Sequence, residues 1–203
     1  MAKAPATPAA KALARDPVMR KVIAAVGPLR EYYRERTDFE TVSRIIVGQQ
    51  LSYAAATTIW KRAAAICPGW RAAEVAALPP DVLRAQGLSG SKTRFILEAA
   101  RRVADGDLDF RRIRRMDDAK ATEALRGIKG FGPWSVEMFL IFGLGRDDVF
   151  SVGDAGLRRA VCTLYDVPRE RYDARVEAIA ERWRPWRSHA CRYLWGWLEV
   201  EGT

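Results

Sequence analysis

The feature that most constrains the fold is the segment GIKGFGPWSVEMFLIFGLGRDDVFSVGD, residues 127–154. Gly130 and Gly132 lie one residue apart, and Pro133 follows them. Proline suits the first turn of a helix because its missing N–H would have no helical partner there. Residues 133–144 are then apolar nearly all round, which is typical of a helix at the centre of a helical domain. The segment therefore predicts a glycine turn that leads directly into a buried helix.

Helical periodicity continues along the rest of the chain. Val18, Val22 and Val26 recur at helical spacing, and Ser52 is a predicted N-cap for the helix YAAATTIWKRAAAI. The one run with an extended pattern is DVFSV, residues 148–152, and a single strand makes no sheet. The sequence thus predicts an all-α protein.

The composition sets limits on size and location. The 203 residues, 49% of them hydrophobic, suffice for one sizeable domain or two small lobes with a shared core. Residues 1–16 are rich in Ala, Pro and Lys and are predicted to be a disordered tail, which leaves residues 17–203 as the folded part. The most apolar run, VEMFLIFGLG, is too short to span a membrane and carries Glu137, so we expect a soluble, cytoplasmic protein.

The charge balance points to a polyanion partner. The 34 Lys and Arg residues outnumber the 25 Asp and Glu residues and give a formal net charge of +9, which favours nucleic acid. A generally basic proteome or plain solubility explains the charge equally well. His189 is the only histidine and the three cysteines are widely spaced, so the sequence gives little support to histidine-based catalysis, disulfides or a metal cluster.

The glycine turn itself fits an anion. Glycines permit positive φ and close approach, and exposed N–H groups with the helix dipole favour a phosphate. The alternative is a tight helix–helix turn with no ligand. A Rossmann fingerprint and a P-loop are both excluded, because the glycine spacing differs and no strand precedes the turn.

Several ordered blocks resemble one family. They are IIVGQQLSYAAA, GLSGSKTRFI, the glycine segment and RWRPWRSHACRYLW, and together they span most of residues 17–198. Their pattern is similar to the helix–hairpin–helix DNA glycosylase superfamily, and within it to the DNA-3-methyladenine glycosylase II branch. The resemblance implies an all-α, two-lobed fold over residues 17–203, with the active site in the cleft between the lobes. The extra N-terminal β-rich domain of larger members is expected to be missing.

The resemblance assigns the chemistry to Asp154, which matches the family's catalytic aspartate. A carboxylate near the sugar stabilises the oxocarbenium-like state formed when a base leaves. Taken alone, Asp154 is also a good N-cap for the helix that follows, and the two roles are compatible. Trp134 stands where bifunctional relatives carry a catalytic lysine, so the resemblance implies a monofunctional enzyme without a cofactor.

The expected base pocket contains Trp134 and Trp195, which match aromatic positions of the branch. Stacking and cation–π attraction there would favour a cationic base. Met138 falls where a larger relative has a tyrosine, which bears on the range of accepted bases. Ordinary core packing is the alternative for each of these side chains.

The expected DNA contacts come from three segments. Gln50 is the candidate wedge that fills the stack when a nucleotide flips out, with Leu51 adjacent, and a buried amide at a turn is the alternative. Ser91 and Lys92 are candidates for a second phosphate contact, against a solvated face. The hairpin contributes Lys129, Gly130, Phe131 and Gly132. The family also suggests a structural monovalent cation at the backbone carbonyls of Arg126, Ile128 and Phe131.

These expectations combine into one functional hypothesis. The chain would act as a monomer on duplex DNA, excise alkylated purines, chiefly 3-methyladenine, and leave an abasic site. One alternative is a helix–hairpin–helix DNA-binding module without chemistry. Another is a glycosylase for a different class of lesion.

Overall fold

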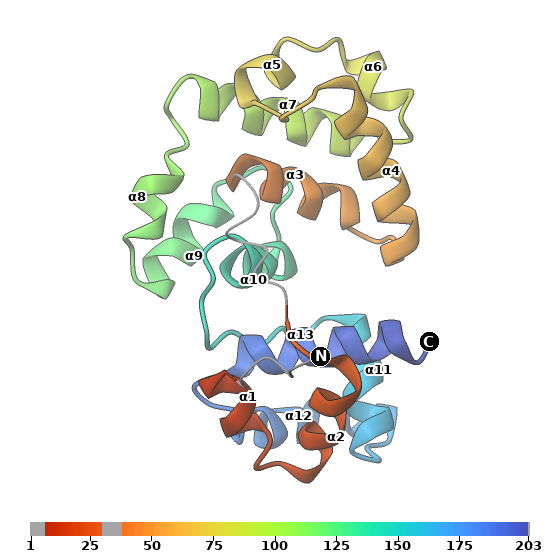
Figure 1. Ribbon diagram of the computed structural model, residues 1–203. Helices are drawn as coiled ribbons and strands as arrows, with labels where there is room; N and C mark the ends of the chain where they lie inside the picture. Colours follow the sequence, from red (N-terminus) through yellow and green to blue (C-terminus); the bar gives the residue numbers. More distant parts are fainter. Residues whose placement is uncertain (1–6, 30–37, 203) are drawn as a thin grey trace. The chain divides into compact units, whose positions relative to one another are not determined.

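The computed structural model describes residues 7–29 and 38–202. Every regular element in these ranges is a helix, and they contain no strand, so the all-α prediction is confirmed. The chain divides into two compact units (Figure 1). We call Tyr32–Gly145 the middle unit, and Met1–Glu31 with Arg146–Thr203 the terminal unit. None of the helices in the described ranges is both long enough and apolar enough to cross a membrane.

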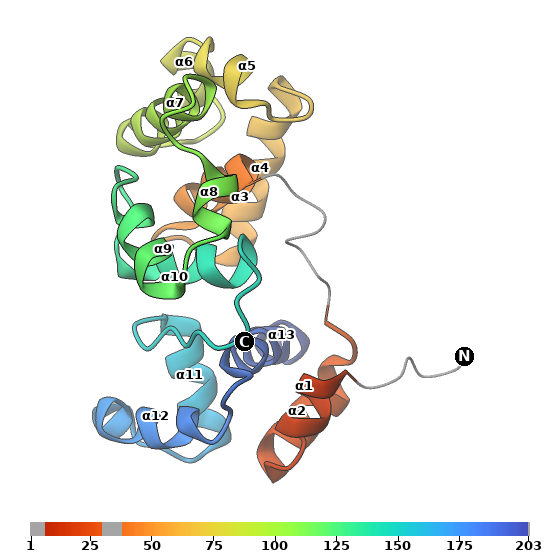
Figure 2. The same ribbon diagram turned by 90° about the vertical axis from the view of Figure 1, so that its left-hand side faces the viewer.

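The middle unit is built around two largely buried helices, α3 (Asp38–Gly48) and α10 (Pro133–Phe142). Its elements are α3 (Asp38–Gly48), α4 (Tyr53–Ile66), α5 (Ala72–Ala76), α6 (Pro80–Arg84), α7 (Gly90–Ala104), α8 (Phe110–Arg114), α9 (Asp118–Arg126) and α10 (Pro133–Phe142). Helices α5, α6 and α7 gather at one end of this unit, and α9 and α10 at the other (Figure 2). Helix α3 packs against both α7 and α10, so it links the two ends.

The terminal unit joins the two ends of the chain. It contains α1 (Pro8–Leu13), α2 (Pro17–Val26), α11 (Ala155–Leu164), the 3-10 turn η2 (Arg169–Arg171), α12 (Tyr172–Glu181) and α13 (Arg187–Val200). Helix α13 contacts α1, α2 and α11 and is therefore the centre of this unit. At Gly196 an added Cβ would lie 2.8 Å from Cγ1 of Val26, so the glycine allows α2 to lie closely against α13.

Side-chain caps explain where several helices begin. Ser52 Oγ accepts the N–H of Ala55 at 3.3 Å, which confirms the predicted N-cap of α4. Ser89 caps α7 in the same way through the N–H of Lys92. Pro133 occupies the first turn of α10, and α10 is the buried helix that its apolar sequence predicts.

The predicted disordered tail is wrong for the part of residues 1–16 that the structure describes. Thr7 Oγ1 accepts the N–H of Ala10 at 3.2 Å and caps α1, with Pro8 in the first turn. Ala9, Ala10 and Leu13 are buried, and α1 contacts α2 and α13. Alanine is the best helix former, so its abundance marked a short docked helix and not disorder. Residues 1–6 lie outside the described ranges.

Candidate active site

The glycine turn joins α9 to α10 and forms a hairpin in the middle unit. Gly130 has φ +85°, in the left-handed region that favours glycine, and an added Cβ would clash with the ring of Phe95. Gly132 is the N-cap of α10 and has no side chain to occupy the end of the helix. The positive end of the helix dipole is therefore open to approach by an anion, as the sequence suggested.

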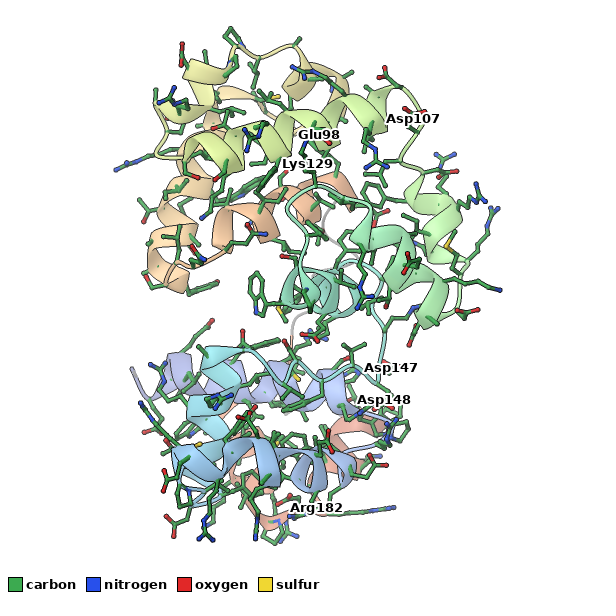
Figure 3. The ribbon with its side chains drawn as sticks, turned by 180° about the vertical axis from the view of Figure 1, so that it is seen from behind. Glu98, Asp107, Lys129, Asp147, Asp148 and Arg182 are labelled. Atoms are coloured by element: carbon green, nitrogen blue, oxygen red, sulfur yellow. The ribbon has the colours of Figure 1, made fainter. Side chains whose placement is uncertain are left out.

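The hairpin is tied to neighbouring helices by side chains. Arg102 donates to the carbonyl of Gly127 at 2.7 Å, and Lys129 pairs with Glu98 at 3.1 Å (Figure 3). Phe131 is 7% exposed, so its side chain is buried and is not a surface contact for DNA. The N–H of Phe131 donates to the carbonyl of Ile128, and a cation at the carbonyls of Arg126, Ile128 and Phe131 stays a prediction.

Residues 49–52, between α3 and α4, form a loop that we call the wedge loop. Gln50 is exposed and has φ +56°, and Leu51 is 39% exposed, so both candidate wedge residues lie at the surface. Tyr53 follows at the start of α4 with 71% exposure and was not predicted as a contact. An exposed large aromatic side chain beside Leu51 makes this tip unusually apolar for a surface loop.

Ser91 and Lys92 differ in their surroundings. Ser91 is exposed and lies 3.0 Å from the hydroxyl of Ser89. Lys92 does not extend into solvent as a phosphate ligand would. Its ammonium donates to the carbonyls of Val47 at 2.8 Å and Gln49 at 2.7 Å, at the end of α3. The structure therefore gives Lys92 an internal role that the sequence did not indicate.

The predicted pocket residues fall in both units. Trp134 and Met138 lie one turn apart on α10 in the middle unit, where Trp134 is half-buried and Met138 is 5% exposed. Trp195 lies on α13 in the terminal unit, as does the loop that carries Asp154. Of the predicted residues, the structure brings Asp154 and Trp195 into direct contact.

Asp154 is held by two donors. Its Oδ1 accepts the N–H of Leu157 at 2.8 Å, which makes it the N-cap of α11, and the indole N–H of Trp195 at 2.9 Å. Both bonds end on the same oxygen, so they fix the rotation of the carboxylate. The N-cap interpretation is confirmed, and the catalytic interpretation remains compatible with it.

Gly156 makes room for this pair. An added Cβ would lie 3.1 Å from Oδ1 of Asp154 and 3.4 Å from Cδ1 of Trp195. Gly156 is not among the site residues predicted from the sequence. The available signal was a glycine in the first turn of a helix, where alanine is the better helix former and a glycine indicates close approach.

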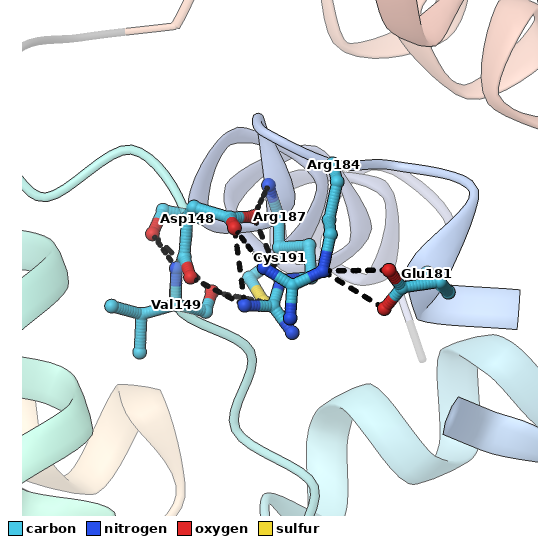
Figure 4. A network of polar contacts seen from close by, with 7 residues as sticks. Asp148, Val149, Glu181, Arg184, Arg187 and Cys191 are labelled. Atoms are coloured by element: carbon cyan, nitrogen blue, oxygen red, sulfur yellow. Dashed lines mark hydrogen bonds and ion pairs between the residues drawn. The ribbon is translucent and has the colours of Figure 1, made fainter. Parts of the chain in front are cut away.

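The chain that leads to Asp154 is clamped onto α13. Asp148 accepts from Arg184 and from Arg187, whose Nε lies 2.7 Å from Oδ1, and Glu181 completes the network (Figure 4). The N–H of Val149 donates to the hydroxyl of Ser188 at 2.9 Å. The DVFSV run forms no strand, and residues of α13 bond to Asp148 and Val149 instead.

Asp147 adds to the same clamp. Its carboxylate lies 2.9 Å from Nε2 of His189, and its carbonyl accepts the N–H of Ser188. The sequence alone does not reveal this contact, because Asp147 and His189 are 42 residues apart. Asp147 pairs with His189 of α13, and Asp148 pairs with Arg187 of α13 and with Arg184 just before it.

Comparisons with known proteins identify the family. The family model for the HhH-GPD superfamily base excision DNA repair protein matches residues 43–185, more than half of the chain. DNA-3-methyladenine glycosylase 1 of Schizosaccharomyces pombe is 28% identical over 186 residues, which cover 89% of this chain and 82% of the relative. YfjP of Bacillus subtilis is 31% identical over 125 residues, 62% of this chain, and the match covers only 44% of that protein's length.

Solved structures show the same fold. The S. pombe 3-methyladenine DNA glycosylase Mag1 in complex with abasic DNA superposes with a TM-score of 0.82 and 28% identity, over 93% of this chain and 95% of that one. A DNA-3-methyladenine glycosidase from Bacillus halodurans gives a TM-score of 0.70 and 31% identity, over 93% and 88% of the two chains. The chain therefore belongs to the HhH-GPD superfamily of base excision DNA repair proteins.

Proposed function

We propose that this protein is a monofunctional DNA glycosylase that excises alkylated purines from duplex DNA and leaves an abasic site. The observation that carries the proposal is the carboxylate of Asp154, fixed through one oxygen by the N–H of Leu157 and the indole of Trp195. The names of the relatives and the DNA in the Mag1 complex support the same substrate class.

The chemistry follows from the charge of the lesion. A purine methylated at a ring nitrogen is cationic, so the bond between C1′ and the base breaks with its electron pair leaving on the base, which becomes neutral. The sugar then carries the positive charge, and water adds to C1′ and loses a proton to solvent. A fixed carboxylate lowers the energy of that cation without reorganising first. No lysine is needed for this step, in agreement with Trp134 at the hairpin position.

DNA recognition is assigned to the two surface elements of the middle unit. The end of α10 at Gly132 would bind a backbone phosphate, and the wedge loop would fill the vacated stack through Gln50 or Leu51. Trp134, Met138 and Trp195 are the proposed contacts of the flipped base. The net charge of +9 adds a sequence-independent attraction to DNA that weakens as salt rises.

The decisive experiment replaces Asp154 with asparagine. Asp154→Asn keeps an N-cap oxygen for Leu157, so the fold is expected to survive. It removes the negative charge, so base release from DNA that carries 3-methyladenine should fall by about a hundredfold or more, the scale of a lost electrostatic group. Affinity for the same duplex should change little.

A panel of substrates separates this function from its alternatives. Duplexes with 3-methyladenine, 7-methylguanine, ethenoadenine and hypoxanthine are incubated with the wild-type protein, and free base is measured. Release of the cationic bases first is the expected result. If the wild-type protein binds these duplexes but releases no base from any of them, the chain is a DNA-binding module and the proposal is wrong.

A further inference from the structure

Gln49 and Lys92 hold the base of the wedge loop, and neither serves the proposed chemistry directly. Nε2 of Gln49 donates to the carbonyl of Gly130 at 2.8 Å and to the hydroxyl of Ser135 at 2.9 Å. The carbonyl can only accept, so the amide nitrogen must face it, and both N–H bonds of that nitrogen are in use. The side chain of Gln49 therefore joins the wedge loop to the glycine turn and to the first turn of α10.

Lys92, in helix α7, binds the backbone at the start of the same loop. Its ammonium donates to the carbonyls of Val47 and Gln49, at the C-terminal end of α3. The last carbonyls of a helix lack helical partners, and the helix dipole favours a cation beside them. Lys92 sits in the first turn of its own helix α7, where the dipole disfavours a cation, so the contacts with α3 account for its charge. Burial lowers the pKa of Lys92 below its ordinary value, as expected for an ammonium drawn away from water.

The part of the loop beyond these contacts is strained and exposed. Gln50 has φ +56°, a conformation that a non-glycine residue keeps only where its surroundings impose it. Leu51 and Tyr53 are two of the few large apolar side chains that are exposed in the described part of the chain. A flexible loop would let these side chains collapse against the protein surface. The hydrogen bonds of Gln49 and Lys92 hold the chain at the start of this exposed segment.

We propose that Gln49 and Lys92 are positioning residues that lock the wedge loop onto the hairpin, so that the tip is ready to enter the DNA stack. The four hydrogen bonds of these two side chains form what we call the latch. The inference rests on the proposed function, because insertion matters only if a nucleotide is flipped. Insertion by a loop that is already ordered costs less conformational entropy than insertion by a loose one.

The test uses isosteric variants of the latch. Gln49→Met and Lys92→Met keep the length of each side chain and remove its N–H donors. The matched controls are Gln86→Met, whose amide donates to Val82 in α6, and Lys61→Met, an exposed lysine of α4. Ser135→Ala is a milder variant that removes one of the two acceptors of Gln49 and leaves both donors.

Three measurements are made on each variant. Hydrogen exchange at the Leu51 amide, which donates to the carbonyl of Gly48 at 3.2 Å, reports the order of the loop. Single-turnover base release from alkylated duplex reports flipping with chemistry. The Kd for undamaged duplex reports phosphate binding alone.

The latch variants should exchange the Leu51 amide about tenfold faster and release base about tenfold more slowly, while the Kd for undamaged duplex stays within about twofold. A tenfold change corresponds to about 1.4 kcal/mol. Ser135→Ala should give about a third of this effect on a logarithmic scale, and both controls should match the wild-type protein.

Two results would overturn the latch. One is unchanged exchange at Leu51 in both methionine variants, and the other is a loss of undamaged-duplex affinity as large as the loss of base release. Failure of the proposed function looks different, because the wild-type protein itself would then release no alkylated base. The exchange measurement does not depend on activity, so it decides whether the latch orders the loop in either case.

Discussion

Replacement of Gly156 by alanine should separate stability from activity. Gly156 lies in the first turn of α11, and an added Cβ would be 3.1 Å from Oδ1 of Asp154 and 3.4 Å from both Trp195 and Leu198. The neighbours must move by a few tenths of an ångström to accept it. The atom nearest to the new methyl group is the carboxylate oxygen that receives both hydrogen bonds, so the strain falls on the proposed catalytic group.

The two opposing effects have similar magnitudes. Alanine is favoured over glycine by about 0.5–1 kcal/mol in a helix, which offsets part or all of the crowding and leaves the Tm within about 3 °C of wild type. A misplacement of 1 Å can cost about a hundredfold in rate, so a shift of about 0.3–0.5 Å should cost roughly fourfold to tenfold. Gly156→Ala should therefore fold normally and excise more slowly.

The assay is single-turnover base release at saturating enzyme, with thermal unfolding measured in parallel. Gly90→Ala is the matched control, because Gly90 also lies in the first turn of a helix and an added Cβ there meets no atom within 4 Å. If Gly156→Ala and Gly90→Ala release base at the same rate, then the position of the Asp154 carboxylate does not limit catalysis, and the argument from its two donors is refuted.

Three further predictions follow from other contacts. Trp195→Phe keeps an aromatic face but loses the indole nitrogen, which lies 2.9 Å from Oδ1 of Asp154. The single-turnover rate of base release should therefore fall about threefold to tenfold. An unchanged rate would limit Trp195 to stacking. Arg187→Met breaks a bidentate pair with Asp148 in which both side chains are at most a quarter exposed. Calorimetry should show a Tm lower by about 2–4 °C for each kcal/mol lost, against a smaller loss for the more exposed Arg184→Met. Asp117 accepts a backbone N–H in the first turn of α9, which lowers its pKa from 3.8, so its charge stabilises the fold above that pH and this contribution is lost as pH falls through the lowered pKa. The Tm gap between wild type and Asp117→Asn should therefore shrink on acidification, and a constant gap would contradict the assignment.

The helical architecture was readable from the sequence because local signals and burial agreed. Ser52 and Pro133 mark helix starts that the structure reproduces, and the apolar run after the glycine turn became the buried helix α10. Where the signal was only compositional, the prediction failed. The alanine-rich composition of residues 1–16 predicts disorder, although Ala9, Ala10 and Leu13 are buried and α1 contacts α2 and α13.

The site was predictable only at positions that match a family motif. Asp154 and Trp195 were named from the sequence, but the hydrogen bond between them was not, because 40 intervening residues must fold before the two meet. The predicted phosphate contact of Lys92 is likewise based on residue type, without the contacts that form only in the folded protein. Sequence gives the charge of a side chain but not its hydrogen-bond partners, which here are the carbonyls of Val47 in α3 and Gln49 in the wedge loop.

Helix α13 links the thermal stability of the protein to the position of Trp195. Arg187 binds Asp148 at the N-terminal end of α13. Trp195 contacts Asp154 eight residues later, about 12 Å along the same helix. Loss of the pair between Arg187 and Asp148 should therefore tilt or fray the helix that carries the indole of Trp195. A genetic screen for temperature-sensitive loss of repair should recover substitutions at Asp148 or Arg187, far from the reacting atoms, and these alleles should regain full activity on cooling.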